Sequence, residues 1–163
     1  MAFVDVVVMA AGKGTRMKSS MPKVLHPLAG RALLWHVLQT ASALGARHQV
    51  VITGHGADQV EALTQAQSTS PKLSFVRQEP QLGTGHAVMQ AMPQLPDDGM
   101  VVVLSGDVPL ISVPTLQRLT QACDNQHLAL LTAQPPDASG YGRVVRDTQG
   151  RVQSIVEHKD AQP

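Results

Sequence analysis

The sequence predicts an α/β fold in which helices cover both faces of a mostly parallel sheet. Short apolar runs rich in β-branched residues alternate along the chain with segments of helical periodicity. Runs that are apolar at every position are typical of strands buried on both faces of a parallel sheet. The 163 residues are 43% hydrophobic but only 2% aromatic, so aliphatic side chains and Met must fill the core. This length suits one domain.

The predicted elements follow one another in a regular order. The first strand spans residues 6–9, and a helix over residues 33–44 follows it, because Leu and Val recur there at helical spacing before Gly45. Asp58 is the expected cap of a second helix, Ser112 with Pro114 opens a fourth, and Pro93 ends the third. The remaining strands are expected at residues 49–53, 73–77, 100–104 and 128–132, and the remaining helices at residues 58–66, 84–92 and 112–122.

The rhythm changes near the end of the chain. Residues 143–146 and 152–157 flank the short turn DTQG, which predicts an antiparallel hairpin added to the otherwise parallel sheet. Only the polar segment HKDAQP follows residue 157, and nothing in it could cover the hairpin. We therefore expect a truncated protein.

Charge and cysteine content exclude several classes of protein. The net charge is +1 and no basic run is interleaved with aromatic residues, which argues against nucleic-acid binding. The N-terminal apolar run is interrupted by Asp5 and is far too short to span a membrane, so we expect a cytoplasmic protein. Cys123 is the only cysteine, which excludes internal disulfides and thiolate zinc sites.

The loop after the first strand, in VVVMAAGKGTRMKSSMPK, is typical of a phosphate-binding turn. Gly12 and Gly14 allow the backbone N–H groups to face an anion, and Arg16 and Lys23 add positive charge. The Walker spacing is absent, and Met17 stands where the dinucleotide fingerprint needs its third glycine. On its glycines alone the loop would be interpreted as a plain turn between a strand and a helix, and the added basic residues shift the balance to a phosphate-binding turn.

Two further loops are expected at the same edge of the sheet. Asp107 follows an apolar strand and Ser-Gly, and one such carboxylate suffices to recruit magnesium together with a nucleotide. Gly83 and Thr84, in QLGTGHA, could bring backbone groups against a base or a ribose. Their ordinary alternatives are a turn aspartate and a simple helix start. His86 and His158 are interpreted as packed or surface residues rather than catalysts.

The segments MAAGKGTRM, MPKVLHPLAG, QLGTGHA, GDVPLIS, GYGR and IVEHKDA together resemble the bacterial bifunctional N-acetylglucosamine-1-phosphate uridylyltransferase and glucosamine-1-phosphate acetyltransferase family. The resemblance implies a Rossmann-like nucleotidyltransferase fold, with residues 1–163 forming the N-terminal portion of that domain. It implies uridylyl transfer from UTP to N-acetylglucosamine 1-phosphate, giving UDP-N-acetylglucosamine for cell-wall precursors and releasing pyrophosphate. The family's left-handed β-helix, which acetylates glucosamine 1-phosphate with acetyl-CoA and forms the homotrimer, would be absent.

The same resemblance assigns roles to residues. Arg16 and Lys23 would be catalytic, Asp107 would hold magnesium, and Gly142 and Glu157 would contact the sugar. The full substrate-binding set would be Met9, Ala10, Ala11, Gly12, Gly14, Thr15, Lys23, Gln78, Gly83, Thr84, Ser105, Gly106, Asp107, Gly142 and Glu157.

This chain also departs from the family. Ser105 stands where relatives can carry a tyrosine, and Met9 replaces a common leucine. The family's later asparagines, one for the sugar and one for the metal, lie beyond Pro163, so we expect little or no activity from this chain alone.

Two other interpretations stay open: another nucleotidyltransferase of this fold that uses CTP or GTP or makes a different sugar nucleotide, and a non-catalytic regulator that binds sugar nucleotides. Arg16, Lys23 and Asp107 argue against the regulator.

Overall fold

The computed structural model describes residues 3–14, 17–68, 72–124, 126–156 and 158–160. The chain divides into two units, Met1–Ala129 and Leu130–Pro163, and each is described by itself. In the described part of the chain, no helix combines the length and apolar character that crossing a bilayer requires.

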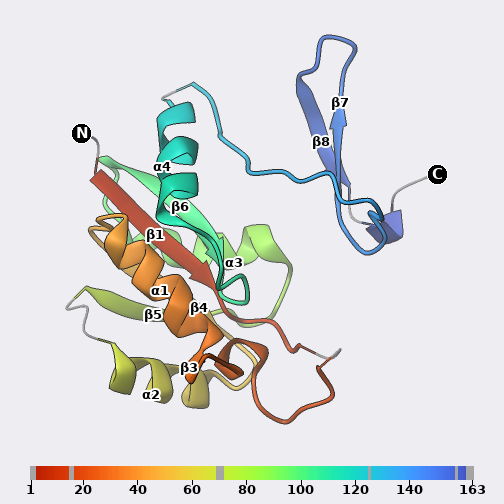
Figure 1. The fold of residues 1–163 in the computed structure, drawn as a ribbon. Helices are drawn as coiled ribbons and strands as arrows, with labels where there is room; N and C mark the ends of the chain where they lie inside the picture. The colour runs from red at the N-terminus through yellow and green to blue at the C-terminus, as the bar shows by residue number, and fades with distance from the viewer. Residues whose placement is uncertain (1–2, 15–16, 69–71, 125, 157, 161–163) are drawn as a thin grey trace. The chain divides into compact units, whose positions relative to one another are not determined.

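A four-stranded parallel sheet organises the first unit (Figure 1). Its strands lie in the order β5 (Leu73–Arg77), β4 (Gln49–Thr53), β1 (Phe3–Met9) and β6 (Gly99–Ser105). In the central strand, Val7 pairs with Val50 of β4 on one side and with Val103 of β6 on the other. The chain thus builds the sheet outward from β1 to β5 and then returns to add β6 beside β1. Open α/β sheets bind ligands outside the carboxyl ends of the strands where the order reverses in this way.

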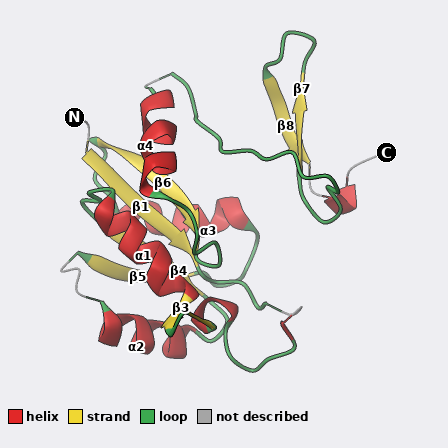
Figure 2. Cartoon of the chain, viewed as in Figure 1, coloured by secondary structure: helices red, strands yellow, loops and turns green. Residues whose placement is uncertain are grey.

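Helices cover both faces of this sheet (Figure 2), as the sequence predicts. They are α1 (Leu33–Ala43), α2 (Ala57–Gln67), α3 (Thr84–Ala91) and α4 (Val113–Ala122). Because successive strand residues face opposite sides, Val6 and Val8 pack with α1, α2 and α4, whereas Val7 packs with α3. Figure 1 shows α1 and α3 on opposite sides of the sheet.

Short elements join these layers. The 3₁₀ helix η2 (Lys23–Leu25) and the small antiparallel pair β2 (Pro27–Leu28) and β3 (Arg31–Ala32) lead from the first loop into α1. A second 3₁₀ helix, η3 (Met92–Gln94), follows α3. The predicted third helix therefore ends at Ala91 as an α-helix, and Pro93 lies within the 3₁₀ turn.

Most of the predicted helix ends agree with the structure to within one residue. Gly45 adopts φ 87° after α1, and Ser112 Oγ accepts a hydrogen bond from the Thr115 backbone at the start of α4. The prediction that Asp58 caps α2 is wrong. Gly56 occupies the N-cap, and Asp58 lies in the first turn, where its carboxylate accepts a hydrogen bond from Arg77 Nη2 at 2.6 Å.

The predicted strand at residues 128–132 is not formed. No strand in the described part of the chain pairs with this segment, and Leu128 and Leu131 are 88% and 56% exposed. An apolar run indicates what a segment would bury, but a strand also needs a hydrogen-bonded neighbour, which periodicity does not supply.

The second unit contains the predicted hairpin, with β7 (Arg143–Arg146) antiparallel to β8 (Val152–Val156). The strands β7 and β8 form a two-stranded sheet of their own, which confirms the predicted antiparallel hairpin. That the hairpin extends the parallel sheet stays a prediction, because each unit is described by itself. A 3₁₀ turn, η4 (His158–Asp160), follows it.

Candidate active site

A cleft of about 800 Å³ opens at the carboxyl ends of the parallel strands. Its volume falls in the range of roughly 300–1,000 Å³ that small-molecule sites occupy. It brings together eleven of the predicted site residues, which come from the ends of three strands and the segments that follow them: Met9, Ala10, Ala11, Gly12, Gly14, Lys23, Gln78, Gly83, Thr84, Ser105 and Asp107. The sequence predicts no site role for the other lining residues, which are Met17, Val24, Gln81 and Ala87.

The loop after β1 is held close to the sheet by backbone hydrogen bonds. Ala10 N donates to Ile52 O at 2.8 Å, and Gly106 N donates to Met9 O at 2.9 Å. A Cβ at Gly106 would lie 3.1 Å from Met9 O, which is tighter than an ordinary contact, so a glycine suits this close approach. The predicted site residue Gly106 therefore braces the loop, and it is not among the residues that line the cleft.

Gly14 lets this loop pass close to Lys23. Its φ is +58°, in the region that favours glycine, and a Cβ there would lie 2.8 Å from Lys23 Cβ. The loop is thereby placed beside an ammonium group, as a phosphate-binding turn requires.

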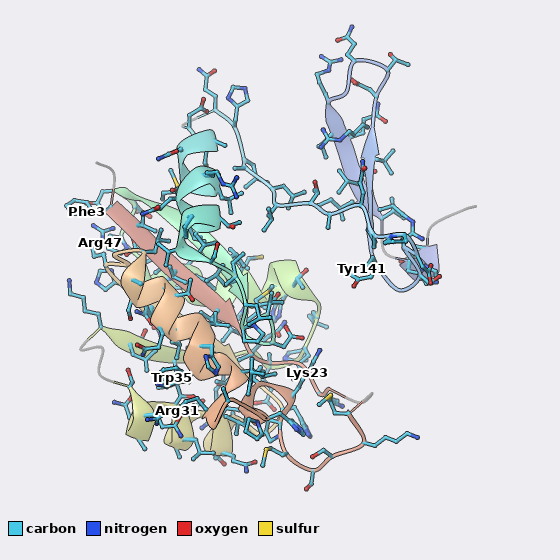
Figure 3. The ribbon with its side chains drawn as sticks, in the orientation of Figure 1. Phe3, Lys23, Arg31, Trp35, Arg47 and Tyr141 are labelled. Atoms are coloured by element: carbon cyan, nitrogen blue, oxygen red, sulfur yellow. The ribbon has the colours of Figure 1, made fainter. Side chains whose placement is uncertain are left out.

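Lys23 and Asp107 form an ion pair at the cleft, with 2.5 Å between Nζ and Oδ2. Their side chains are 41% and 30% exposed, so both remain accessible to a ligand. Lys23 is labelled in Figure 3. The two groups come from the loops after β1 and β6, and their meeting confirms that these loops converge.

Gln78 lies at the end of β5 and is 6% exposed. Its backbone N–H donates to Thr53 O at 2.8 Å, and its side-chain Nε2 donates to Gly83 O at 2.9 Å. Gly83 is the N-cap of α3 with φ 98° and no side-chain cap. The N–H groups of the first turn, which begins at Thr84, have no partner within the helix, and they lie where a ligand can accept from them.

Gln81 is a site residue that sequence reasoning missed. Its Nε2 donates to Ala11 O at 2.8 Å and thus ties the segment after β5 to the loop after β1. Gly54 leaves the space for this bond, because a Cβ there would lie 2.5 Å from Gln81 Nε2. The signal available was the position of Gln81 in QLGTG, two residues before Gly83.

A charged network supports the strand ends behind Gln78. Arg77 donates to Glu61 from Nε at 2.9 Å and from Nη2 at 2.7 Å, and the buried Thr53 donates to Glu61 from Oγ1 at 2.6 Å. The hydrogen bonds from Arg77 hold the pKa of Glu61 below its ordinary value, against the opposing effect of burial, and Thr53 adds to this. The network fixes Thr53, whose carbonyl receives the Gln78 N–H.

Three predicted site residues, Thr15, Arg16 and Glu157, lie outside the described residues. Gly142 belongs to the second unit, where it precedes β7. The structure therefore leaves the roles predicted for these four residues as predictions.

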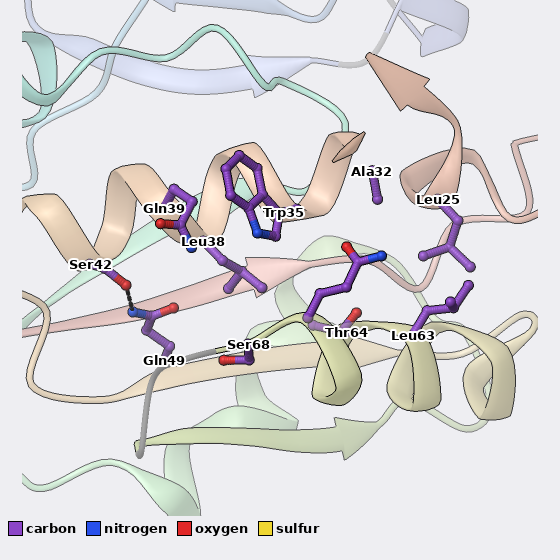
Figure 4. Close-up of a pocket in the computed structure, with 11 residues that line it drawn as sticks. Leu25, Ala32, Trp35, Leu38, Gln39, Ser42, Gln49, Leu63, Thr64 and Ser68 are labelled. Atoms are coloured by element: carbon purple, nitrogen blue, oxygen red, sulfur yellow. Dashed lines mark hydrogen bonds between the residues drawn. The ribbon is translucent and has the colours of Figure 1, made fainter. Parts of the chain in front are cut away.

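A second pocket of about 20 Å³ lies between α1 and α2 (Figure 4). Trp35 and Leu38 of α1 face Leu63 and Thr64 of α2 across it, and Gln49 donates to Ser42 Oγ at 2.8 Å. A space of this size holds about one water molecule, so the large cleft is the candidate site.

Potential metal ligands are few at the cleft. Among the residues that the structure describes, no group of three or more His, Cys, Asp or Glu could hold a metal ion. Asp107 supplies a single accessible carboxylate beside Lys23, a donor set that suits magnesium carried in with a nucleotide better than a cation held by the protein alone.

Comparisons with known proteins agree with this geometry. Residues 6–151 match the model of the MobA-like NTP transferase domain. The chain is 63% identical over 163 residues to the Bifunctional protein GlmU of Polaromonas naphthalenivorans, which covers 96% of this chain and 34% of that protein. It is 64% identical over 162 residues to the protein of the same name from Albidiferax ferrireducens, covering 98% and 35%. The chain thus spans about a third of the length of these curated relatives.

Among solved structures, a nucleotidyl transferase from Methanothermobacter thermautotroptrophicus superimposes with a TM-score of 0.66. The two sequences are 25% identical, and the match covers 75% of this chain and 58% of that one.

Proposed function

Because this chain belongs to the MobA-like NTP transferase domain family, we propose that its cleft binds UTP and N-acetylglucosamine 1-phosphate and forms UDP-N-acetylglucosamine and pyrophosphate. One observation carries this proposal: Lys23 and Asp107 meet at 2.5 Å in a cleft of about 800 Å³ at the carboxyl edge of the sheet. The identity of 60% or more to proteins named Bifunctional protein GlmU supports the choice of these substrates.

The reaction is an in-line displacement at phosphorus. A phosphate oxygen of the sugar phosphate attacks the α-phosphorus of UTP and forms the new P–O bond, while the bond to the bridging oxygen breaks and pyrophosphate leaves with the electron pair. Such a transfer needs positioning and charge stabilisation rather than a covalent enzyme intermediate. The ammonium group of Lys23 and the guanidinium group of Arg16 would neutralise the negative charge that develops on the phosphoryl oxygens.

The loop after β1 would hold the triphosphate. Gly12, Gly14 and Thr15 would direct backbone N–H groups to the phosphates, and Gln78 with the first turn of α3 would hold the base. Asp107 would bind magnesium with the nucleotide phosphates, and the ion would add charge stabilisation at the phosphates. Gly142 and Glu157 would contact the sugar.

The longer relatives suggest what surrounds this reaction. A protein of their length would also acetylate glucosamine 1-phosphate with acetyl-CoA, assemble as a homotrimer through its second domain, and supply UDP-N-acetylglucosamine to cell-wall and lipopolysaccharide synthesis in the cytoplasm. The words "Bifunctional protein" in the relatives' name support two activities.

The test has two stages. Calorimetry of this chain with UTP, CTP, GTP and UDP-N-acetylglucosamine in magnesium should give tighter binding of the uridine ligands. A chain of the relatives' full length should then release pyrophosphate from UTP only when N-acetylglucosamine 1-phosphate is present. Preference for CTP or GTP would indicate another nucleotidyltransferase, and uridine binding without pyrophosphate release with any sugar phosphate would indicate a regulator.

A further inference from the structure

The side chain of Gln78 has only one orientation that its surroundings accept. The atom of its amide that lies 2.9 Å from Gly83 O must be the NH₂ group, because a carbonyl oxygen only accepts hydrogen bonds. The same Nε2 lies 3.2 Å from Nδ1 of His86, so its second hydrogen points to that ring nitrogen. Gln78 therefore turns both of its donors toward α3.

This arrangement determines which tautomer a neutral His86 ring adopts. A neutral imidazole has one N–H and one bare nitrogen, and Nδ1 must be the bare one to accept from Gln78. The proton then lies on Nε2, which faces the amide of Gln90 at 3.2 Å. Gln90 must then turn its amide oxygen to this nitrogen, which costs little because the bond it gives up, from Gln90 Nε2 to His86 O, is long at 3.4 Å. The Gln78 amide is held more firmly than the Gln90 amide, because its hydrogen bond to Gly83 O is shorter, at 2.9 Å.

The remaining atom of the Gln78 amide, Oε1, is an acceptor open to the cleft. Within the part of the chain that the structure describes, no donor bonds it. His26 Nε2 is the sole fully buried side-chain N or O atom without a partner there, so Oε1 reaches accessible space. Because Gln78 lines the cleft and is only 6% exposed, we place this acceptor at the cleft.

An acceptor at this place distinguishes the pyrimidine bases. Uracil carries a donor, N3–H, between two carbonyl oxygens, whereas cytosine has a bare N3 beside its amino group. A carbonyl oxygen held against N3 attracts uracil and repels cytosine, and a site built around one hydrogen bond discriminates strongly against an analogue that lacks it.

We infer that His86 is a positioning residue for base selection: its bare Nδ1 acts together with Gly83 O to hold the Gln78 amide with Oε1 toward the cleft, so that the site accepts uridine and rejects cytidine nucleotides. His86 is not among the residues that line the cleft, and it acts through Gln78. This inference rests on the proposed function, which places the base at Gln78, and it adds the residue that sets the direction of that amide.

The test compares UTP and CTP binding by calorimetry in His86→Leu, His86→Asn and His36→Leu. His86→Leu removes one of the two acceptors that hold the Gln78 NH₂ group and leaves only Gly83 O. The amide is then less firmly oriented, so the ratio of UTP to CTP affinity should fall by about threefold to tenfold. His86→Asn can keep an acceptor in that place and should retain most of the ratio. His36 is the control, because its ring also makes one hydrogen bond, from Nε2 to Leu28 O at 2.8 Å, and does not line the cleft. His36→Leu should leave the ratio of UTP to CTP affinity unchanged.

The nitrogen shifts of the histidine rings give a second readout that needs no nucleotide. Long-range proton–nitrogen NMR spectra of the chain, with His86 assigned by its absence in His86→Asn, should show the Nε2–H tautomer for this ring. The Nδ1–H tautomer would overturn the inference, even if His86→Leu failed to fold. If a folded His86→Leu variant lost UTP and CTP affinity equally, the inference about His86 would be overturned and the proposed function would remain intact. A wild-type chain that binds neither nucleotide would overturn both.

Discussion

Lys23 Nζ lies 2.5 Å from Asp107 Oδ2, so the two charges neutralise each other across the cleft. The proposed function gives them different partners: phosphate for Lys23 and magnesium for Asp107. A triphosphate that binds Lys23 and a magnesium ion that binds Asp107 must together replace this ion pair. Both side chains are partly exposed, which screens the pair and keeps its net contribution to stability small. The pair is therefore well suited to keep the empty site organised and to part when substrate arrives.

Replacing Lys23 by Met should separate the two roles. The affinity for UTP with magnesium should fall by about tenfold or more, because a charge-assisted contact to phosphate is lost. The affinity for magnesium alone should rise by about twofold to fivefold, because Asp107 no longer has a cation beside it. Calorimetry with each ligand measures both effects.

Lys72→Met is the matched control for this change. Lys72 is exposed and precedes the amino end of β5, whereas the cleft lies at the carboxyl ends of the strands. The Lys72→Met substitution therefore changes the net charge by the same amount as Lys23→Met without touching the cleft. If both variants weakened UTP binding to the same extent, Lys23 would be acting through the overall field of the protein and not by contact.

Asp107→Asn tests the metal assignment. The substitution keeps the shape of the side chain but removes the charge that attracts magnesium. Magnesium should strengthen UTP binding to the wild-type chain relative to a titration in EDTA, and this gain should disappear in Asp107→Asn. An unchanged gain would mean that the nucleotide alone carries the ion, with no protein carboxylate involved.

Gly54→Ala should disturb the cleft through Gln81. The added methyl group would lie 2.5 Å from Gln81 Nε2, so the side chain must move and its hydrogen bond to Ala11 O must weaken. We expect a loss of about 1 kcal/mol in the free energy of unfolding and a weaker affinity for UTP. Chemical denaturation and calorimetry measure the two effects.

A double-mutant cycle with Gln81→Ala shows whether Gln81 carries the effect. In the Gln81→Ala background the methyl group meets no amide, so Gly54→Ala should weaken UTP binding less than it does alone. Additive effects would assign the disturbance instead to the contacts with Ala11, whose Cβ and O would lie 3.0 and 3.1 Å from the new atom.

The sequence predicts which strands and loops form the site better than it predicts the hydrogen bonds between side chains within the site. The run VVVM, the glycines after it and Asp107 after the apolar strand are local patterns, and a parallel sheet brings their loops to one edge. The bonds of Gln81 to Ala11 and of His86 to Gln78 depend on side-chain directions across loops, which no periodicity records. For that reason the sequence identifies Gln78 through family resemblance and overlooks Gln81.

The misplaced elements have a similar cause. Residues 128–132 have the composition of a strand, but composition does not provide the neighbouring strand that completes its hydrogen bonds. Asp58 has the chemistry of a helix cap, but Arg77 lies close enough to take its carboxylate. In both places a partner distant in the sequence decides the outcome, and a local pattern cannot identify that partner.

At the opposite edge of the sheet, a buried carboxylate should make the fold sensitive to acid. Asp5 is fully buried on β1 and accepts hydrogen bonds from Arg47 Nε at 3.1 Å and Nη2 at 2.7 Å, while His48 Nδ1 lies 2.9 Å away. Arg47 also lies over the ring of Phe3, at 4.5 Å, and both are labelled in Figure 3. Burial by itself raises the pKa of Asp5, but the hydrogen bonds from Arg47 and His48 outweigh it, so that the pKa lies below its ordinary value of 3.8.

The direction of this pKa shift sets the direction of the pH effect. Because the folded pKa is lower than the unfolded one, the unfolded chain binds more protons in acid, and the stabilisation from Asp5 is complete above about pH 5 and is lost as the pH falls through the folded pKa. Asp5→Asn should lower the free energy of unfolding at pH 7 by about 3 kcal/mol, because it leaves Arg47 without its buried partner. It should also flatten the decline between about pH 5 and pH 3. Urea titrations of both proteins across this range measure the two slopes, and equal slopes would show that other carboxylates, such as Glu61 with its own lowered pKa, govern acid unfolding.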